Sequence, residues 1–192
     1  MSPLPNREGF FYFMAKPNPN TIRPILQKKE DMRPVDVFFS RLDASHKNAT
    51  NRLLHYICVP LMLFALLAIT WAIPFPYLKF IGSYNGMFNW ASFLIAFCVY
   101  YTLKLSPILS YTMLILLFGL SYGVSLLAAW ELAGGIPLIW MGTLLLAIAW
   151  LGQYLGSKQE GNPASFKDDT QLVLITPIWV LYSLFKRLGW RY

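Results

Sequence analysis

Charge is scarce in this chain. Of 192 residues only 13% are Asp, Glu, Lys or Arg, whereas 56% are hydrophobic and the mean hydropathy is +0.46. Soluble domains carry roughly 25% charged residues, so this composition disfavours a soluble fold and favours a membrane protein. Cysteine is also rare: Cys58 and Cys98 both fall in apolar segments, where thiols are more often packing residues than a disulfide or a metal site.

Motifs for common soluble chemistry are missing as well. The sequence contains no phosphate-binding loop and no cysteine pairs at zinc-finger spacing. Its net charge is +7, and nine of the sixteen Lys and Arg precede residue 53. A basic face can bind nucleic acid, but beside apolar spans it more often marks the cytoplasmic side and anionic headgroups. We therefore expect membrane lipids as partners, and no nucleic acid.

Long apolar segments are what the chain has in abundance. Four are long enough to cross a bilayer, which takes roughly 20 residues: Leu53–Ile73, Met87–Leu103, Pro107–Trp130 and Ile136–Leu155. A fifth stretch, Leu172–Phe185, is shorter and contains Pro177, which is more typical of a re-entrant or interfacial hairpin. Basic residues before the first span, at Lys104, in the 157–170 loop and in the tail place both termini in the cytoplasm by the positive-inside rule.

The region before the first span divides in two. Val35, Phe38, Phe39 and Leu42 follow a helical period, which predicts a short amphipathic helix on the membrane surface. Residues 1–31 hold five prolines and no such period, so we expect a flexible Pro-rich extension. The predicted fold is thus an all-α, polytopic membrane helix bundle: an N-terminal amphipathic helix, four spans and a short hydrophobic hairpin, in a single domain over residues 32–192.

Both histidines of the chain lie at the mouth of the first span. If Asn48 caps that helix, Asn51 and His55 are one turn apart on the same face. His46 precedes the cap and could fold back toward that face. Polar, metal-capable residues at the end of a membrane helix indicate a functional site.

A second polar cluster lies where the fourth span ends. Gln153, Ser157 and Glu160 share one face if the helix continues, and the predicted topology puts them at the same membrane surface as the histidines. Two imidazoles with a carboxylate suit Fe(II) or Zn, and Asn and Gln side chains could orient such ligands. The alternative, that these residues bind no metal, stays open. A histidine near a helix start is more often simply hydrogen-bonded, and Glu160 alone is more often a solvated loop charge.

Two runs of residues resemble the motifs of a known family. They are Met32-Arg33-Pro34 with Ser45-His46-Lys47-Asn48, Asn51 and His55-Tyr56-Ile57-Cys58-Val59-Pro60, and Gln153-Tyr154-Leu155-Gly156-Ser157-Lys158-Gln159-Glu160-Gly161-Asn162-Pro163-Ala164. The chain is similar, over about residues 32–188, to a family of small membrane proteins whose characterised fungal member is an endoplasmic-reticulum dioxygenase acting on 2-hydroxy fatty acids. The order, spacing and intervening spans of the two motifs all match.

The resemblance implies a membrane-bound, Fe(II)-dependent dioxygenase that cleaves a long-chain 2-hydroxy fatty acid with O2 to a product one carbon shorter. It implies His46 and His55 as iron ligands. From the residues of the second polar cluster we expect Glu160 as the third ligand. Asn48, Asn51, Gln153 and Ser157 would then surround the ligands. The membrane would be the bacterial inner membrane or the endoplasmic reticulum, depending on the host.

Ser157 departs from the family pattern, which has a histidine directly after the Gln-x-x-Gly run. Serine is a poor Fe(II) ligand beside imidazole. Either Glu160 completes a site of two histidines and one carboxylate, or the metal site is weakened or lost. The competing function is therefore a non-catalytic relative that binds lipid or scaffolds a partner. A small transporter ranks lower, because the spans carry no charge near their centres.

Overall fold

The computed structural model describes residues 33–80, 82, 88–159 and 170–190. Within these residues all regular structure is helical, in six α-helices labelled α3 to α8. The chain divides into two units, residues 1–37 and 38–192, and we describe each by itself. The predicted extension, residues 1–31, lies outside the described residues.

Helix α3, Pro34–Ser45, covers the residues for which the sequence predicts an amphipathic helix, and it contains the boundary between the two units. In the first unit Arg33 forms an ion pair with Asp36 (3.0 Å) at the start of this helix. In the second unit Phe39 and Leu42 are buried, one turn apart as the apolar stripe predicts. The position of α3 on a membrane surface stays a prediction.

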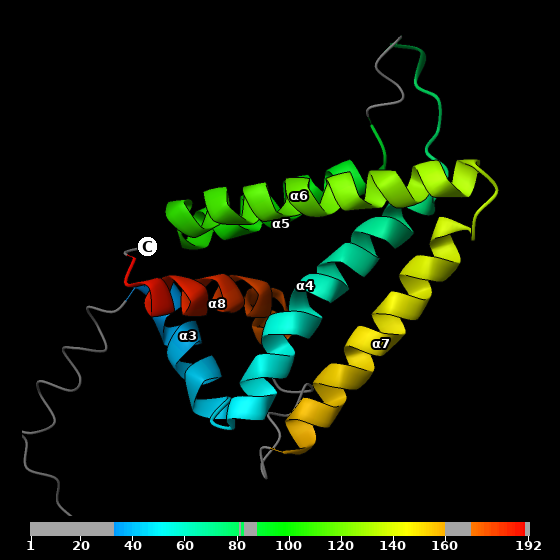
Figure 1. Cartoon of the computed structure of the whole chain (residues 1–192). Coiled ribbons are helices and arrows are strands. Elements are labelled where there is room, and N and C mark those ends of the chain that lie inside the picture. The colour runs from blue at the N-terminus through cyan, green and yellow to red at the C-terminus, as the bar shows by residue number, and fades with distance from the viewer. Residues whose placement is uncertain (1–32, 81, 83–87, 160–169, 191–192) are drawn as a thin grey trace, which may run out of the picture. The chain divides into compact units, whose positions relative to one another are not determined.

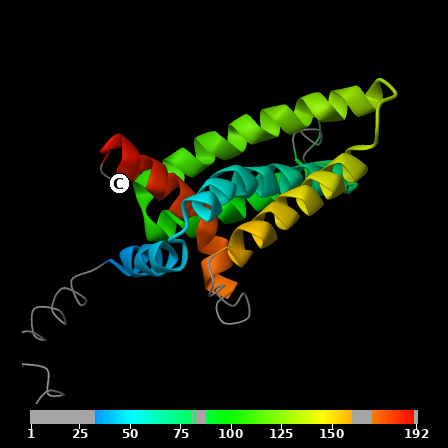
Figure 2. The same ribbon diagram turned by 60° about the horizontal axis from the view of Figure 1, so that its bottom comes forward.

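Helices α4, Ala49–Ala72, and α7, Leu138–Lys158, lie side by side and antiparallel (Figures 1 and 2). Asn48 caps α4 by accepting a hydrogen bond from the Thr50 amide (2.8 Å), as the sequence predicts. Glycine permits the close approach: a Cβ on Gly142 would lie 2.9 Å from Ile69 Cγ1. Small residues serve this purpose between membrane helices, where backbones pack closely.

Helices α5, Trp90–Leu105, and α6, Pro107–Leu132, pack against each other and are joined by Ser106 alone. Asn89 and Ser92 form a capping box at the start of α5, and proline suits the first residue of α6 because that position has no intrahelical amide bond to lose. At the turn, Thr102 Oγ1 donates to Ser110 Oγ (3.1 Å). This bond ties the two helices where they meet.

The C-terminal apolar stretch is a single helix, α8, Thr170–Leu188, which continues through Pro177. The sequence predicts a hairpin here, and the described residues show no reversal of the chain within it. Ile175, Ile178 and Trp179 are fully buried, and α8 packs against α4 and α6 (Figure 1). The segment forms one helix because it buries a face against neighbouring helices. The length of the apolar stretch alone does not predict this packing.

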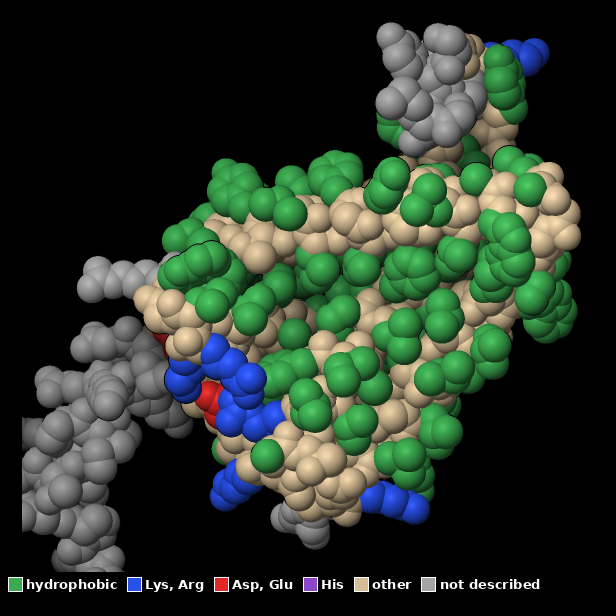
Figure 3. Space-filling view, viewed as in Figure 1, with side chains coloured by type: hydrophobic (Ala, Val, Ile, Leu, Met, Phe, Trp, Pro, Cys, Tyr) green, Lys and Arg blue, Asp and Glu red, His purple; other side chains and the backbone are tan. Residues whose placement is uncertain are grey.

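Three of the described helices, α4, α6 and α7, are long and apolar enough to span a membrane. They correspond to three of the four predicted spans. The remaining predicted span, Met87–Leu103, corresponds to α5, which is apolar but has only 16 residues. Its length is about 24 Å at 1.5 Å per residue, whereas the hydrocarbon core is about 30 Å thick. Hydrophobic side chains cover much of the surface of α6 and α7 (Figure 3), as expected for lipid-facing helices.

Candidate functional site: a buried histidine pair at the ends of α4 and α7

The two histidines meet in the structure. His46, between α3 and α4, and His55, in the second turn of α4, are 8% and 6% exposed. Their Nε2 atoms lie 3.0 Å apart, and their rings are nearly perpendicular, with centroids separated by 4.4 Å. The chain thus turns at the cap of α4, and this turn brings the two Nε2 atoms together.

The surroundings of His46 fix which of its nitrogens carries the proton. Nδ1 lies 2.8 Å from the Leu42 carbonyl oxygen and 2.9 Å from Ser45 Oγ, and the Ser45 hydroxyl itself donates to that carbonyl. A carbonyl can only accept, so Nδ1 is the protonated nitrogen and Nε2 of the neutral ring carries a lone pair. Metal-binding histidines commonly have this arrangement, with the other ring N–H donated to a backbone carbonyl.

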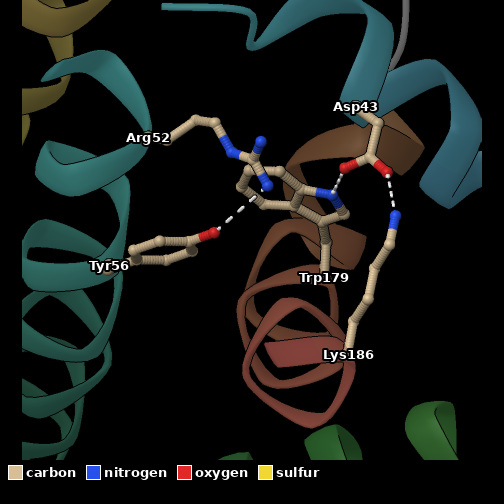
Figure 4. A network of polar contacts seen from close by, with 5 residues as sticks. All are labelled: Asp43, Arg52, Tyr56, Trp179 and Lys186. Carbon is tan, nitrogen blue, oxygen red and sulfur yellow. Dashed lines mark hydrogen bonds and ion pairs between the residues drawn. The ribbon is translucent and has the colours of Figure 1, made fainter. Parts of the chain in front are cut away.

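Trp179 of α8 packs against both imidazoles. Its ring centroid lies 5.0 Å from that of His46 and 6.3 Å from that of His55. Asp43 of α3 holds the indole by accepting its Nε1–H (2.9 Å), and Lys186 lies 3.5 Å from the other carboxylate oxygen (Figure 4). A tryptophan placed in this way shields the histidine pair from water on one side.

The helix ends that carry the two predicted polar clusters lie together, because the start of α4 packs on the end of α7. Asn51 is 1% exposed, and a Cβ on Gly156 would lie 2.5 Å from its Oδ1. The missing side chain of Gly156 therefore leaves the space that the Asn51 amide occupies. At the helix ends, Asn48 Nδ2 donates to the Gln159 carbonyl (3.4 Å).

Gln153 and Ser157 form their hydrogen bonds with groups other than the histidines. Gln153 is buried but donates to Met62 Sδ (2.7 Å), seven residues or about two turns along α4 from His55. The Ser157 hydroxyl donates to the Tyr154 carbonyl of its own helix (2.9 Å). Helix α7 ends at Lys158, so the helix does not continue to Glu160, which lies outside the described residues.

The donor set can be compared with the needs of a metal ion. Two imidazole nitrogens that bind one metal at about 2.1 Å, at right angles, lie about 3 Å apart, which agrees with the separation of the two Nε2 atoms. The pair also agrees with a plain N–H···N hydrogen bond. No third His, Cys, Asp or Glu joins it among the described residues. The described part of the chain therefore fits two adjacent ligands and supplies no third.

Sequence reasoning missed Trp179 and Asp43. The signals were present: Trp179 carries an N–H donor two residues after Pro177 in an apolar stretch, and Asp43 follows the apolar stripe of α3. Neither signal names a partner, because the two residues are 136 positions apart. Only the packing of α8 on the site connects them.

One hydrolase-like pattern proves unrelated to the site. The run Gly119-Leu120-Ser121-Tyr122-Gly123 has the G-x-S-x-G spacing but lies in the middle of α6, and the Ser121 hydroxyl donates to the Leu117 carbonyl (2.8 Å). A nucleophile elbow needs a sharp strand-to-helix turn that exposes the serine. Ser121 is therefore an ordinary helix serine.

Comparison with known families gives a match over most of the chain. Residues 32–188 match the family described as 2-hydroxy-palmitic acid dioxygenase Mpo1-like. The chain belongs to the Mpo1-like family. The match begins just before α3 and ends at the last residue of α8, so it includes every element that contributes to the histidine pair. No curated protein and no solved structure matches the chain.

Proposed function

We propose that this Mpo1-like protein is a membrane-bound, non-haem Fe(II) dioxygenase. Its substrates would be long-chain 2-hydroxy fatty acids, cleaved with O2 to products one carbon shorter. The observation that carries the proposal is the buried His46–His55 pair, whose Nε2 atoms converge to 3.0 Å while the Leu42 carbonyl holds the Nδ1 proton of His46. The family description supports the class of substrate.

Each residue of the site has a role in this proposal. His46 and His55 hold the metal, and Glu160 completes a set of two histidines and one carboxylate. Asn51 stays against Gly156 and keeps α4 and α7 in register. Iron, when bound, supplies the redox chemistry with dioxygen that breaks the bond between C1 and C2 of the acid. Trp179 keeps water from the histidines, which protects reactive chemistry.

The fold suggests how the protein sits in a membrane. If α5 crosses with α4, α6 and α7, the four spans leave the start of α4, the end of α7 and both termini on one side. We propose that this side faces the cytoplasm, because basic residues favour the cytoplasmic side of a membrane protein. The domain then comprises residues 32–192, and the site lies at the cytoplasmic surface of the endoplasmic reticulum or of a bacterial inner membrane.

The proposal is tested by lipid mass spectrometry. Membranes that contain the full chain are given isotope-labelled 2-hydroxypalmitic acid with Fe(II) under air, and matched samples receive a chelator or no oxygen. We expect a labelled C15 product that disappears in both matched samples. If folded protein yields no such product at any chain length, the dioxygenase proposal is overturned.

The state of Ser157 favours a second candidate, a non-catalytic family member that binds lipid or scaffolds a partner. Its hydroxyl is bound to the Tyr154 carbonyl, and serine is a weak iron ligand. This candidate expects the same lipid contacts but neither iron nor product.

Introducing a histidine at position 157 should strengthen the metal site. In Ser157→His an imidazole replaces a hydroxyl that bonds only within its own helix, and we expect iron affinity to rise by about tenfold or more. Metal content is measured per chain after dialysis against graded chelator.

A control for this variant exists in α6. Ser125 is also half-buried and its hydroxyl also donates to the carbonyl three residues before it (Tyr122, 2.7 Å). Ser125→His should leave iron content unchanged. Equal iron content in Ser157→His and the wild type would contradict the placement of residue 157 at the metal.

A further inference from the structure

A cluster of cations lies next to the histidine pair, where α8 passes the start of α4. Figure 3 shows Lys and Arg side chains gathered in this region, beside apolar ones, and Figure 4 shows Arg52 and Tyr56 extending from α4 toward Trp179 and Lys186 of α8. Arg52 Nη2 donates to the Tyr56 hydroxyl (3.4 Å). Arg187 lies over the Tyr56 ring, with Cζ 4.9 Å from its centroid. Two guanidinium groups thus share one tyrosine.

The cluster has more positive charge than the described protein neutralises. Lys186 is paired with Asp43. Within the described part of the chain, neither Arg52 nor Arg187 lies within ion-pair distance of a carboxylate. Arg52 is half-buried, and its Nε is shielded from solvent with no hydrogen-bond acceptor among the described residues. A partly desolvated cation without a counter-charge favours the binding of an anion.

The geometry suits a planar anion with two oxygens. A guanidinium presents parallel N–H donors that match a carboxylate, and such bonds are stronger than neutral ones. The Tyr56 oxygen accepts from Arg52, so its own O–H proton is free to donate to the same anion. Arg52, Tyr56 and Arg187 therefore offer donors from two helices around one position.

The surroundings favour an anion with an apolar tail. Four large hydrophobic side chains within five residues of an arginine of the cluster are 50–58% exposed: Leu53 and Ile57 on α4, and Leu184 and Leu188 on α8. On a helix, residues three and four apart are neighbours, so Leu184 borders Arg187. A small soluble anion gains nothing from contact with these apolar side chains, whereas the alkyl chain of a long-chain acid can pack against them.

We propose that Arg52, Tyr56 and Arg187 form a carboxylate site that holds the acid group of a long-chain fatty acid at the membrane surface. Trp179 connects this site to the histidines, because its ring packs on Tyr56 (centroids 6.2 Å apart) as well as on His46 and His55. In this site the arginines are the residues that select free acids. Only the identity of that acid as the substrate rests on the proposed function. Phosphate headgroups share the anionic chemistry and are distinguished by experiment.

Binding of radiolabelled palmitic acid tests the site. Purified full-length protein in detergent micelles, without iron, is titrated with the acid, and protein-free micelles give the background. We expect Arg52→Gln and Arg187→Gln each to weaken binding about tenfold or more, since each removes a charge-assisted contact, and Tyr56→Phe about threefold, since it removes a neutral donor. Hexadecanol, of equal length but uncharged, should bind the wild type and all variants alike.

Lys104→Gln is the matched control. Lys104 is exposed and lies over the Tyr100 ring (4.5 Å), a cation–π contact like that of Arg187, at the end of a different helix. It should leave palmitate binding unchanged. If Lys104→Gln weakens binding as much as Arg187→Gln, or if neither arginine variant weakens it, the inference is overturned. Arg187 is exposed, so its variant keeps the test valid even if Arg52→Gln fails to fold.

A competition arm separates the sources of the anion. Unlabelled palmitate should displace the label much better than dipalmitoyl phosphatidic acid; equal displacement by the phosphatidic acid assigns the site to lipid headgroups and overturns the fatty-acid assignment. The readout needs neither iron nor turnover. If the protein binds palmitate through the arginines but never converts 2-hydroxypalmitate, the carboxylate site stands and the proposed function is overturned. If it converts 2-hydroxypalmitate but the arginines do not affect palmitate binding, the proposed function stands and the carboxylate site is overturned.

Discussion

Replacing His55 with alanine should lower the yield of the one-carbon-shorter acid by more than about 100-fold. His55 supplies one of two converging Nε2 atoms, and loss of a metal-binding residue is expected to cost more than the 10–100-fold typical of residues that only support such ligands. His46→Ala should have a similar effect. Both are measured as labelled C15 product per mole of folded protein in membranes with added Fe(II).

Cys58→Ala is the control for a buried substitution on the same helix. Cys58 lies one turn beyond His55 and is equally buried, at 6% exposure. A thiol there acts as a small apolar group, so this variant should keep close to wild-type activity. Activity that survives in both His46→Ala and His55→Ala contradicts the proposed metal site, whereas loss in Cys58→Ala shows that any change in the helix abolishes function.

Gly152→Ala should destabilise the protein, although alanine is the better helix former. Its new Cβ would lie 2.5 Å from Cys58 Sγ in the interface between α4 and α7. Overpacking of this kind costs about 1–3 kcal/mol, against a gain of about 1 kcal/mol in helix propensity. We expect a net loss of up to about 2 kcal/mol, measured as a fall of several degrees in the thermal midpoint in detergent. Activity should fall with it, because the same interface holds Asn51 near the histidines.

Two further variants make this test specific. Cys58 Sγ is the one heavy atom recorded within 4 Å of the added Cβ, so the double variant Cys58→Ala/Gly152→Ala should recover most of the lost stability. Gly119→Ala, within α6, has open space around its Cβ and should be neutral or slightly stabilising. A double variant no more stable than Gly152→Ala alone contradicts the contact between the two helices.

Much of the architecture follows from one-dimensional patterns. Apolar length predicts α4, α6 and α7 because the bilayer sets the number of residues a span needs. Asn48 predicts the start of α4 because its side chain satisfies an amide that the helix leaves free. The prediction of a C-terminal hairpin was less successful: Leu172–Phe185 looks too short to span, but α8 extends beyond it at both ends and buries Trp179 against its neighbours.

The candidate site is harder to predict from the sequence than the helices are. Spacing places Asn51 and His55 on one helix face, since residues four apart are adjacent on a helix. It also places His46 near enough to fold back. It does not predict the contact of Gln153 with Met62, because a helical period gives the face of a residue and not its partner on another helix.

Composition, length and local hydrogen bonding act within a few residues. They were enough to predict an all-helical protein with three long apolar helices, the cap of α4 and the gathering of both histidines at one helix end. Three contacts depend on the packing of the helices. His46 and His55 meet at their Nε2 atoms, Asp43 holds Trp179 against them, and Arg187 lies over the ring of Tyr56, 131 positions away in the chain. Such contacts depend on how helices pack, and helix packing is set by shape and volume over the whole interface rather than by any local pattern.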